Sequence, residues 1–261
     1  MWLGLIGLIS FASLLWFWST GRDSSPVDDA GVRLEVDVDA YRNPPSDEVA
    51  SAAEEIDVVE DLSEPVGEVT PVAERADQGW VDRVSTVTGV PSRAMHAYAG
   101  AALWLAEENP SCGIGWNTLA AIGEVESHHG GIDGNVLLPD GHPRVRIIGV
   151  ALSGEGVARI RDTDGGVLDD DPEWDRAVGP MQFIPATWSQ WAADGNGDGV
   201  RDPQQIDDAV LAAARYLCFA GGDLSVPGNW ISAVTAYNHS IEYNNRVAEV
   251  ADRYRLLAEG Q

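Results

Sequence analysis

The sequence contains no lysine: all 16 of its basic residues are arginine, against 42 aspartate and glutamate residues. The formal net charge at pH 7 is −26. This excess of negative charge argues against binding to nucleic acid, because the phosphates would be repelled, and it predicts a soluble, self-repelling surface. With 44% hydrophobic residues in 261, the chain can still bury a sizeable core, in one domain with extensions or in two small domains.

Charge is also absent from residues 2–18, which form one apolar run. Its length is at the lower limit for a bilayer span. We expect residues 1–20 to be an uncleaved membrane anchor rather than a cleaved signal peptide or a buried core helix, because no small-x-small cleavage site precedes Thr20. The folded part would then lie outside the cytoplasm, attached to the membrane, or secreted if the segment is removed.

Cysteine is scarce, with only Cys112 and Cys218. Two cysteines by themselves are compatible with a buried free pair, a disulfide or part of a metal site. Since the N-terminal segment predicts export, and exported proteins keep disulfides, we expect these two residues to be bonded to each other.

Sustained apolar periodicity is missing from residues 21–78. This stretch has 17 acidic residues and 4 arginines, which is half of the chain's net charge in about a fifth of its length. Such a composition predicts a disordered, self-repelling linker.

From residue 79 to residue 261 the pattern becomes helical and predicts one folded, mainly α domain. Apolar periodicity and helix-ending glycines and prolines favour helices, with Ser92 as the N-cap of the second; they cover residues 79–91, 92–110, 117–127, 185–194, 207–222, 229–240 and 242–259. About fifty residues separate the third helix from the fourth, too many for an idle connection in a compact domain. We expect short strands in this insertion, within residues 145–152, and a role as a cleft wall.

Glu126 is the candidate catalytic acid. On a helix it shares a face with Leu119 and Ile122, whereas Glu124 points elsewhere and is expected to meet solvent. A carboxyl on an apolar face loses hydration when it ionises, so its pKa should rise. A carboxylic acid that keeps its proton at neutral pH is what the protonation of a glycosidic oxygen requires. A structural carboxylate paired with arginine remains the alternative.

Two further segments carry polar side chains suited to sugars. Met181 and Gln182 lie between a Gly-Pro turn and a helix, and the Gln182 amide can both donate and accept hydrogen bonds. Tyr237 and Asn238 end an apolar helix. The adjacent pair His128 and His129 does not suit zinc, because neighbouring residues on a helix point in different directions.

Four motifs, "AAIGEVESHHG", "AVGPMQFIPATW", "DGNGDGVRDPQQIDDAVLAAARYLC" and "AYNHS", occur in this order. Together they resemble the lytic transglycosylases of the lysozyme-like superfamily, in particular the membrane-bound-B type carried by actinobacteria. The resemblance covers roughly residues 80–255. It implies a lysozyme-like domain of the goose-lysozyme and soluble lytic transglycosylase type, with a long insertion that is partly β and partly irregular.

The resemblance also implies a reaction. The family cleaves peptidoglycan glycan strands between N-acetylmuramic acid and N-acetylglucosamine without water and closes a 1,6-anhydro ring. Glu126 matches the family's single acid/base. Gln182, with Met181 beside it, matches the G-x-x-Q-F segment, and Tyr237 and Asn238 match the Tyr-Asn pair; these should bind the substrate. No organic cofactor is implied.

The stretch "DGNGDGVRD" predicts a structural calcium site. Asp194, Asn196, Asp198 and Val200 fall on positions 1, 3, 5 and 7 of a calcium loop. The last carboxylate of the resembling family comes at position 15, where this chain has Asp208. An empty acidic turn is the alternative.

Two other functions stay open. A lysozyme-type hydrolase would need a second carboxylate, for which Asp175 and Asp133 are candidates. A wall-binding protein without catalysis would not need Glu126 at all.

Overall fold

The computed structural model describes residues 70–154 and 156–260. The predicted anchor and most of the predicted linker lie outside these residues. None of the helices in the described part of the chain combines the length and the hydropathy that a membrane span requires. The end of the predicted linker belongs to the fold, because Val72 is only 1% exposed. The folded domain therefore begins earlier than residue 79.

The described residues are mainly helical, with one small antiparallel sheet. This confirms the predicted fold class and is consistent with a lysozyme-like domain. In chain order the elements are the 3-10 helix η2 (Val72–Glu74), α1 (Gln78–Thr88), α2 (Ser92–Glu108), α3 (Trp116–Ser127), the 3-10 helix η3 (Ile132–Gly134), β1 (Ile148–Ala151), β2 (Arg176–Val178), α4 (Pro185–Trp191), α5 (Ile206–Gly221), α6 (Pro227–Tyr237) and α7 (Ile241–Glu259).

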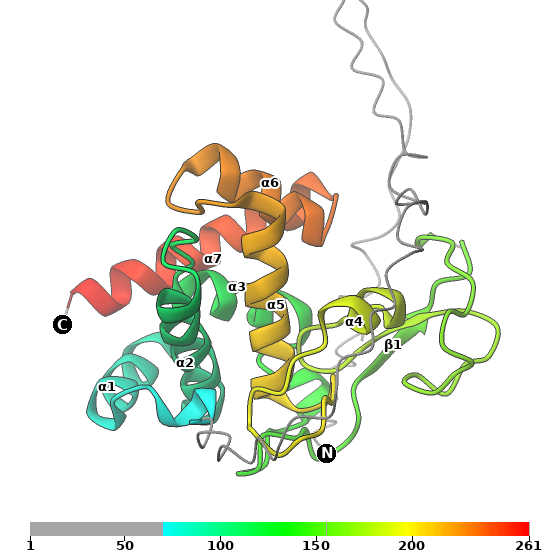
Figure 1. Ribbon diagram of the computed structural model, residues 1–261, viewed down its shortest axis with the longest axis horizontal. Helices are drawn as coiled ribbons and strands as arrows, with labels where there is room; N and C mark the ends of the chain where they lie inside the picture. The colour runs from blue at the N-terminus through cyan, green and yellow to red at the C-terminus, as the bar shows by residue number, and fades with distance from the viewer. Residues whose placement is uncertain (1–69, 155, 261) are drawn as a thin grey trace, which may run out of the picture. The chain divides into compact units, whose positions relative to one another are not determined.

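Helix α5 occupies the centre of the fold, between α2 and α4 (Figure 1). Ala209, Ala212 and Ala213 on this helix are completely buried. Their small side chains let neighbouring helices approach closely. A similar approach occurs at Gly100 of α2, where a Cβ atom would collide with the carbonyl of Val72. This contact explains how η2 packs on α2.

The ends of α1 follow local sequence signals, whereas the start of α2 differs from the prediction. Asp77 caps α1 by accepting a hydrogen bond from the Trp80 amide at 2.8 Å, and Gly89 ends α1 in the left-handed conformation with φ 79°. The prediction that Ser92 caps α2 is wrong. The N-cap is Pro91, which has no side-chain hydrogen bond, and Ser92 is already inside the helix.

The long insertion contains the predicted short strand. β1 pairs antiparallel with β2 and brings the insertion against the segment that leads into α4. The predicted disulfide is also present: Cys112, before α3, is bonded to Cys218 of α5, with a Cα–Cα distance of 5.4 Å. The bond ties the entry to α3 to the central helix.

Candidate active site

Glu126 lies in the last turn of α3, on the face that the sequence predicted. Leu119 and Ile122 on this face are completely buried, whereas the Glu126 side chain is half-buried and keeps some access to solvent. Its Oε1 atom accepts a hydrogen bond of 2.6 Å from the hydroxyl of Tyr243. Burial raises the pKa of Glu126 to about 7, and the hydrogen bond from Tyr243 opposes part of that rise. Near neutral pH this carboxyl can therefore both give and take a proton.

The end of α3 is closed by two non-glycine residues in the left-handed region. His128 has φ 50° and His129 has φ 58°. The His129 amide donates to the carbonyl of Gly123 at 2.9 Å and satisfies one of the last carbonyls of the helix. Left-handed backbone is strained for residues with a side chain, so other contacts must hold this turn in place.

Those contacts centre on the His129 ring, which is buried. Its Nδ1 lies 3.0 Å from the hydroxyl of Tyr98, and its Nε2 lies 3.1 Å from that of Tyr254. Glu124 also reaches this ring, with Oε2 3.2 Å from Nε2. The Glu124 side chain is 23% exposed, so the prediction that it meets solvent holds only in part. The hydrogen bond to His129 holds the pKa of Glu124 below its usual value, so Glu124 is an anchoring carboxylate rather than an acid.

Ser127 connects the end of α3 to the turn that carries Gln182. Its hydroxyl donates a 2.6 Å hydrogen bond to the carbonyl of Pro180 and accepts one of 2.8 Å from the amide of Gly130. From the other side, the Tyr237 hydroxyl donates to the carbonyl of Met181 at 2.7 Å. Ser127 thus holds Pro180 against the end of α3, and Tyr237 holds Met181 against the end of α6.

Within this turn Gln182 has a left-handed backbone, with φ 51°. Its side-chain amide donates to the Gly179 carbonyl at 2.9 Å, and its Oε1 lies close to Gly149 of β1, where a Cβ atom would be 3.1 Å away. Gln182 is partly exposed, whereas the side chain of Met181 is completely buried. Only the main-chain carbonyl of Met181 takes part in the site.

Tyr237 and Tyr243 flank the carboxyl of Glu126. Burial raises the pKa of each phenol well above its ordinary value, and the nearby charge of Glu126 raises it further. Asn238, just after α6, uses its side-chain carbonyl to accept from the Ser240 amide at 3.0 Å. Glu126, Gln182, Tyr237 and Asn238 are thus joined to one another through the Pro180–Met181 turn and the ends of α3 and α6.

One known family matches part of the chain. Residues 171–223 match the model of the transglycosylase SLT domain. The matched segment contains Met181 and Gln182 and the whole of helices α4 and α5. Glu126 and the two tyrosines that flank it lie outside. A search of curated proteins found no match to the chain.

Sequence reasoning missed Tyr243 and Ser127. Tyr243 lies in the first turn of α7, whose N-cap Ser240 accepts a hydrogen bond from the Tyr243 amide. No local signal marks Tyr243 as a partner of Glu126, from which it is 117 residues away. Ser127 directly follows Glu126, but its partner Pro180 is 53 residues away.

The two candidates for a second carboxylate, Asp175 and Asp133, lie in different environments. Asp175 is completely buried, and its oxygens accept from the amide and the hydroxyl of Thr163. Asp133 is exposed, in η3 just after α3. A buried and already bonded carboxylate is poorly suited to activating water, so of the two only Asp133 is available for a hydrolytic mechanism.

The predicted calcium loop lies inside the matched segment, between α4 and α5. Asp194 accepts hydrogen bonds from the amides of Gly197 at 2.7 Å and Gly199 at 2.9 Å, and Asn196 and Asp198 accept from amides within the same loop. Asp208 is 1% exposed, and burial raises its pKa to about 6.

These side-chain oxygens are of the hard type that calcium prefers, so the chemistry of the donor set fits the ion. Among the described residues, however, three carboxylates with oxygens within 4.8 Å of one another occur only at Asp162, Asp164 and Asp175. Within residues 194–208, side-chain oxygens that could bind an ion already accept hydrogen bonds from backbone amides of the loop. Calcium binding there thus stays a prediction.

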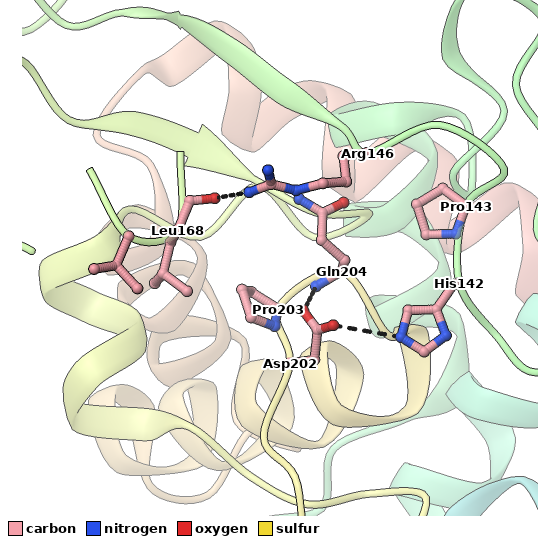
Figure 2. A pocket seen from close by; sticks show the side chains of 8 residues that line it. His142, Pro143, Arg146, Leu168, Asp202, Pro203 and Gln204 are labelled. Carbon is pink, nitrogen blue, oxygen red and sulfur yellow. Dashed lines mark hydrogen bonds and ion pairs between the residues drawn. The ribbon is translucent and has the colours of Figure 1, made fainter. Parts of the chain in front are cut away.

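A surface pocket of about 250 Å³ is lined by residues of the insertion and of the segment just before α5, and it does not include Glu126. Figure 2 shows Arg146 and His142 on its walls, with Asp202 next to His142. Gln204 on the same wall exchanges two hydrogen bonds with the main chain of Ile147, and the Ile147 carbonyl accepts from the amide of Gly179. Gln204 is thus connected through Ile147 to Gly179, next to the Pro180–Met181 turn.

Proposed function

We propose that the chain is a lytic transglycosylase that cleaves the β-1,4 bond between N-acetylmuramic acid and N-acetylglucosamine in peptidoglycan. The observation that carries this proposal is the half-buried Glu126, with a pKa of about 7, hydrogen-bonded to Tyr243. The match of residues 171–223 to the transglycosylase SLT domain supports the same substrate and enzyme class.

In the first step, the protonated carboxyl of Glu126 gives its proton to the glycosidic oxygen. The bond from that oxygen to C1 of muramic acid breaks, and N-acetylglucosamine leaves with a free 4-hydroxyl. Positive charge develops at C1, and the carboxylate just formed would stabilise it.

In the second step, the Glu126 carboxylate takes the proton of the muramic C6 hydroxyl. The C6 oxygen attacks C1 and closes the 1,6-anhydro ring, which returns Glu126 to its protonated form. One carboxyl serves both steps without a net change in protonation. A pKa near 7 favours both transfers, because neither form of the carboxyl is strongly preferred.

Other residues would position the substrate. Gln182, with a partly exposed amide, and Asn238, half-buried beside α6, would bind N-acetyl groups. Tyr237 would hold the Pro180–Met181 turn through its hydroxyl and present its ring edge to the sugar. We further propose that the domain acts outside the cytoplasm, with residues 1–20 as its membrane anchor, and that calcium in the loop 194–208 stabilises the connection from α4 to α5.

Digestion of purified sacculi tests the proposal. The wild-type chain should release fragments that are one water lighter than reducing ends, as seen by mass spectrometry. Glu126→Gln should abolish release while the melting temperature stays near that of the wild type, and Glu242→Gln, the same change at an exposed position on α7, should keep the activity. Products with reducing ends, lost in Asp133→Asn, would instead identify a hydrolase. A fully active Glu126→Gln variant would rule out both mechanisms.

A further inference from the structure

Phe219 is an exposed residue on α5, a helix that is otherwise mostly buried. Most residues of α5 are inaccessible to solvent, yet the Phe219 side chain is 76% exposed. A single exposed apolar residue is ordinary on a protein surface. Phe219, however, contacts a second ring: its centroid lies 4.9 Å from that of Trp191, at the end of α4.

The contact continues inward from the surface. Trp191 also packs against Tyr216 of α5, at 5.6 Å between centroids, and Tyr216 packs against Tyr237 of α6 at 5.8 Å. We call the four residues Phe219, Trp191, Tyr216 and Tyr237 the aromatic chain. It begins at an exposed ring and ends at the tyrosine that flanks Glu126.

The rings are held by fixed elements rather than by a loop. Phe219 directly follows Cys218, which is bonded to Cys112. The Tyr216 hydroxyl donates to the carbonyl of Ala236 at 2.8 Å, next to Tyr237. The outer rings therefore have a defined position relative to Glu126, as a binding surface on a rigid scaffold needs.

We propose that Trp191 and Phe219 form an outer subsite, on which a sugar of the glycan strand stacks while another sugar of that strand lies at Glu126. This inference rests on the proposed function for the identity of the strand. The CH groups of a pyranose ring carry partial positive charge and are attracted to the negative face of an aromatic ring. Sugar sites combine such apolar surfaces with a few polar groups.

Two observations favour a glycan over other occupants. The aromatic chain packs ring against ring from Phe219 to Tyr237, which flanks Glu126, and in this proposal one extended ligand spans its two ends. The net charge of −26 without a single lysine disfavours an anionic membrane surface, which attracts basic segments. A strand with a neutral sugar backbone avoids that repulsion.

Binding of N-acetylglucosamine oligomers, measured by calorimetry on the full chain, tests the subsite. The wild type should bind chitohexaose more tightly than chitobiose, because only the longer oligomer reaches the outer rings. The double variant Trp191→Ala/Phe219→Ala should lose about tenfold in affinity for chitohexaose and be unchanged for chitobiose. Phe219→Tyr, which keeps a ring, should retain the preference.

Leu256→Ala serves as the control, since Leu256 is 54% exposed on α7, a helix that contributes no ring to the aromatic chain. If the double variant does not fold, Phe219→Ala alone decides, because this side chain is mostly in solvent. Equal losses for both oligomers, no loss for either, or no oligomer binding by the wild type would each overturn the proposal. So would binding of wild type to anionic vesicles that Phe219→Ala removes without any effect of oligomer length.

The two proposals can fail separately. If Glu126→Gln stops cleavage but the outer-ring variants bind both oligomers normally, only the subsite is wrong. If sacculi are not cleaved at all but length-dependent binding is lost in the outer-ring variants, the subsite stands and the catalytic proposal fails.

Discussion

The hydroxyl of Tyr243 lies 2.6 Å from Oε1 of Glu126 and donates a hydrogen bond to it. Two effects thereby meet at one carboxyl. Burial favours the neutral acid and raises the pKa, whereas the hydrogen bond favours the carboxylate and lowers it. Burial is the larger effect, and the result, about 7, suits the role as both acid and base that we propose for Glu126.

The pKa of Glu126 predicts the pH dependence of cleavage. The reaction begins with the protonated form, so the rate should fall as pH rises through about 7, by about tenfold for each further pH unit. Release of soluble fragments from sacculi between mildly acidic and alkaline pH measures this. A rate that stays constant well above that pH would show that Glu126 is not the acid.

Tyr243→Phe should move this limb of the profile toward higher pH. The change removes the effect that lowers the pKa of Glu126, so the acid form persists to more alkaline conditions. The maximum rate should fall about three- to tenfold, the equivalent of one ordinary hydrogen bond. Tyr254→Phe removes a similar hydroxyl from His129 and should leave the position of the limb unchanged.

Gly123→Ala should disturb the end of α3. A Cβ atom at residue 123 would collide with the ring and hydroxyl of Tyr98, and Tyr98 is completely buried. We expect a loss of about 1–3 kcal/mol in the free energy of unfolding, together with reduced activity, since Glu126 lies less than one turn further on. Thermal unfolding measures the first. Gly228→Ala on α6, where nothing lies within 4 Å of the added atom, should show neither effect.

The position of Glu126 could be predicted because it depends on local periodicity. A helix that buries Leu119 and Ile122 must place the residue one turn later on the same face. The partners of that helix end could not be predicted in the same way. Periodicity places Glu124 away from the apolar face and therefore predicts solvent around it, whereas His129 folds back beyond the helix and reaches it.

Distance along the chain explains why the contact between Tyr243 and Glu126 was not predicted. Tyr243 is 117 residues from Glu126, and nothing local to either residue indicates that they meet. The cap at Pro91 was missed for a different reason: Ser92 has the right side chain for a cap, but Pro91 already has the extended backbone that precedes a helix. The disulfide could be predicted because the apolar N-terminal segment indicates export and the chain then offers one possible pair.

Removing the disulfide should destabilise the domain. Cys112 and Cys218 are 106 residues apart, and closing so long a loop restricts the unfolded chain strongly. Cys112→Ser/Cys218→Ser should lower the free energy of unfolding by about 2–5 kcal/mol, measured by denaturant titration. Reductant should affect the wild type and not the double variant. Identical midpoints for both proteins would contradict this role.

Calcium should stabilise the wild-type chain if the loop 194–208 binds it. Burial raises the folded-state pKa of Asp208 to about 6, so without an ion stability is full below the unfolded pKa and is lost as pH rises through about 6. A cation would offset that loss, and added calcium should raise the melting temperature near neutral pH. Asp198→Asn should remove this response.

The same calcium titration on Asp162→Asn separates the two carboxylate groups. Asp162 belongs to the other cluster, with Asp164 and Asp175. If Asp162→Asn loses the rise in melting temperature and Asp198→Asn keeps it, the ion binds at that cluster instead. If calcium does not raise the melting temperature of the wild type, the domain does not bind calcium at either place.

The bond between Cys112 and Cys218 has a consequence for a chain exposed to proteases. Residues 113–217, which include Glu126, Gln182 and the whole insertion, lie inside the covalent ring that it closes. A single peptide-bond cut in the insertion would leave two fragments that stay joined, one with the acid and the other with Tyr243. Such a nicked molecule would migrate as one species until reductant separates it, and it could keep working after damage that would divide an uncrosslinked enzyme.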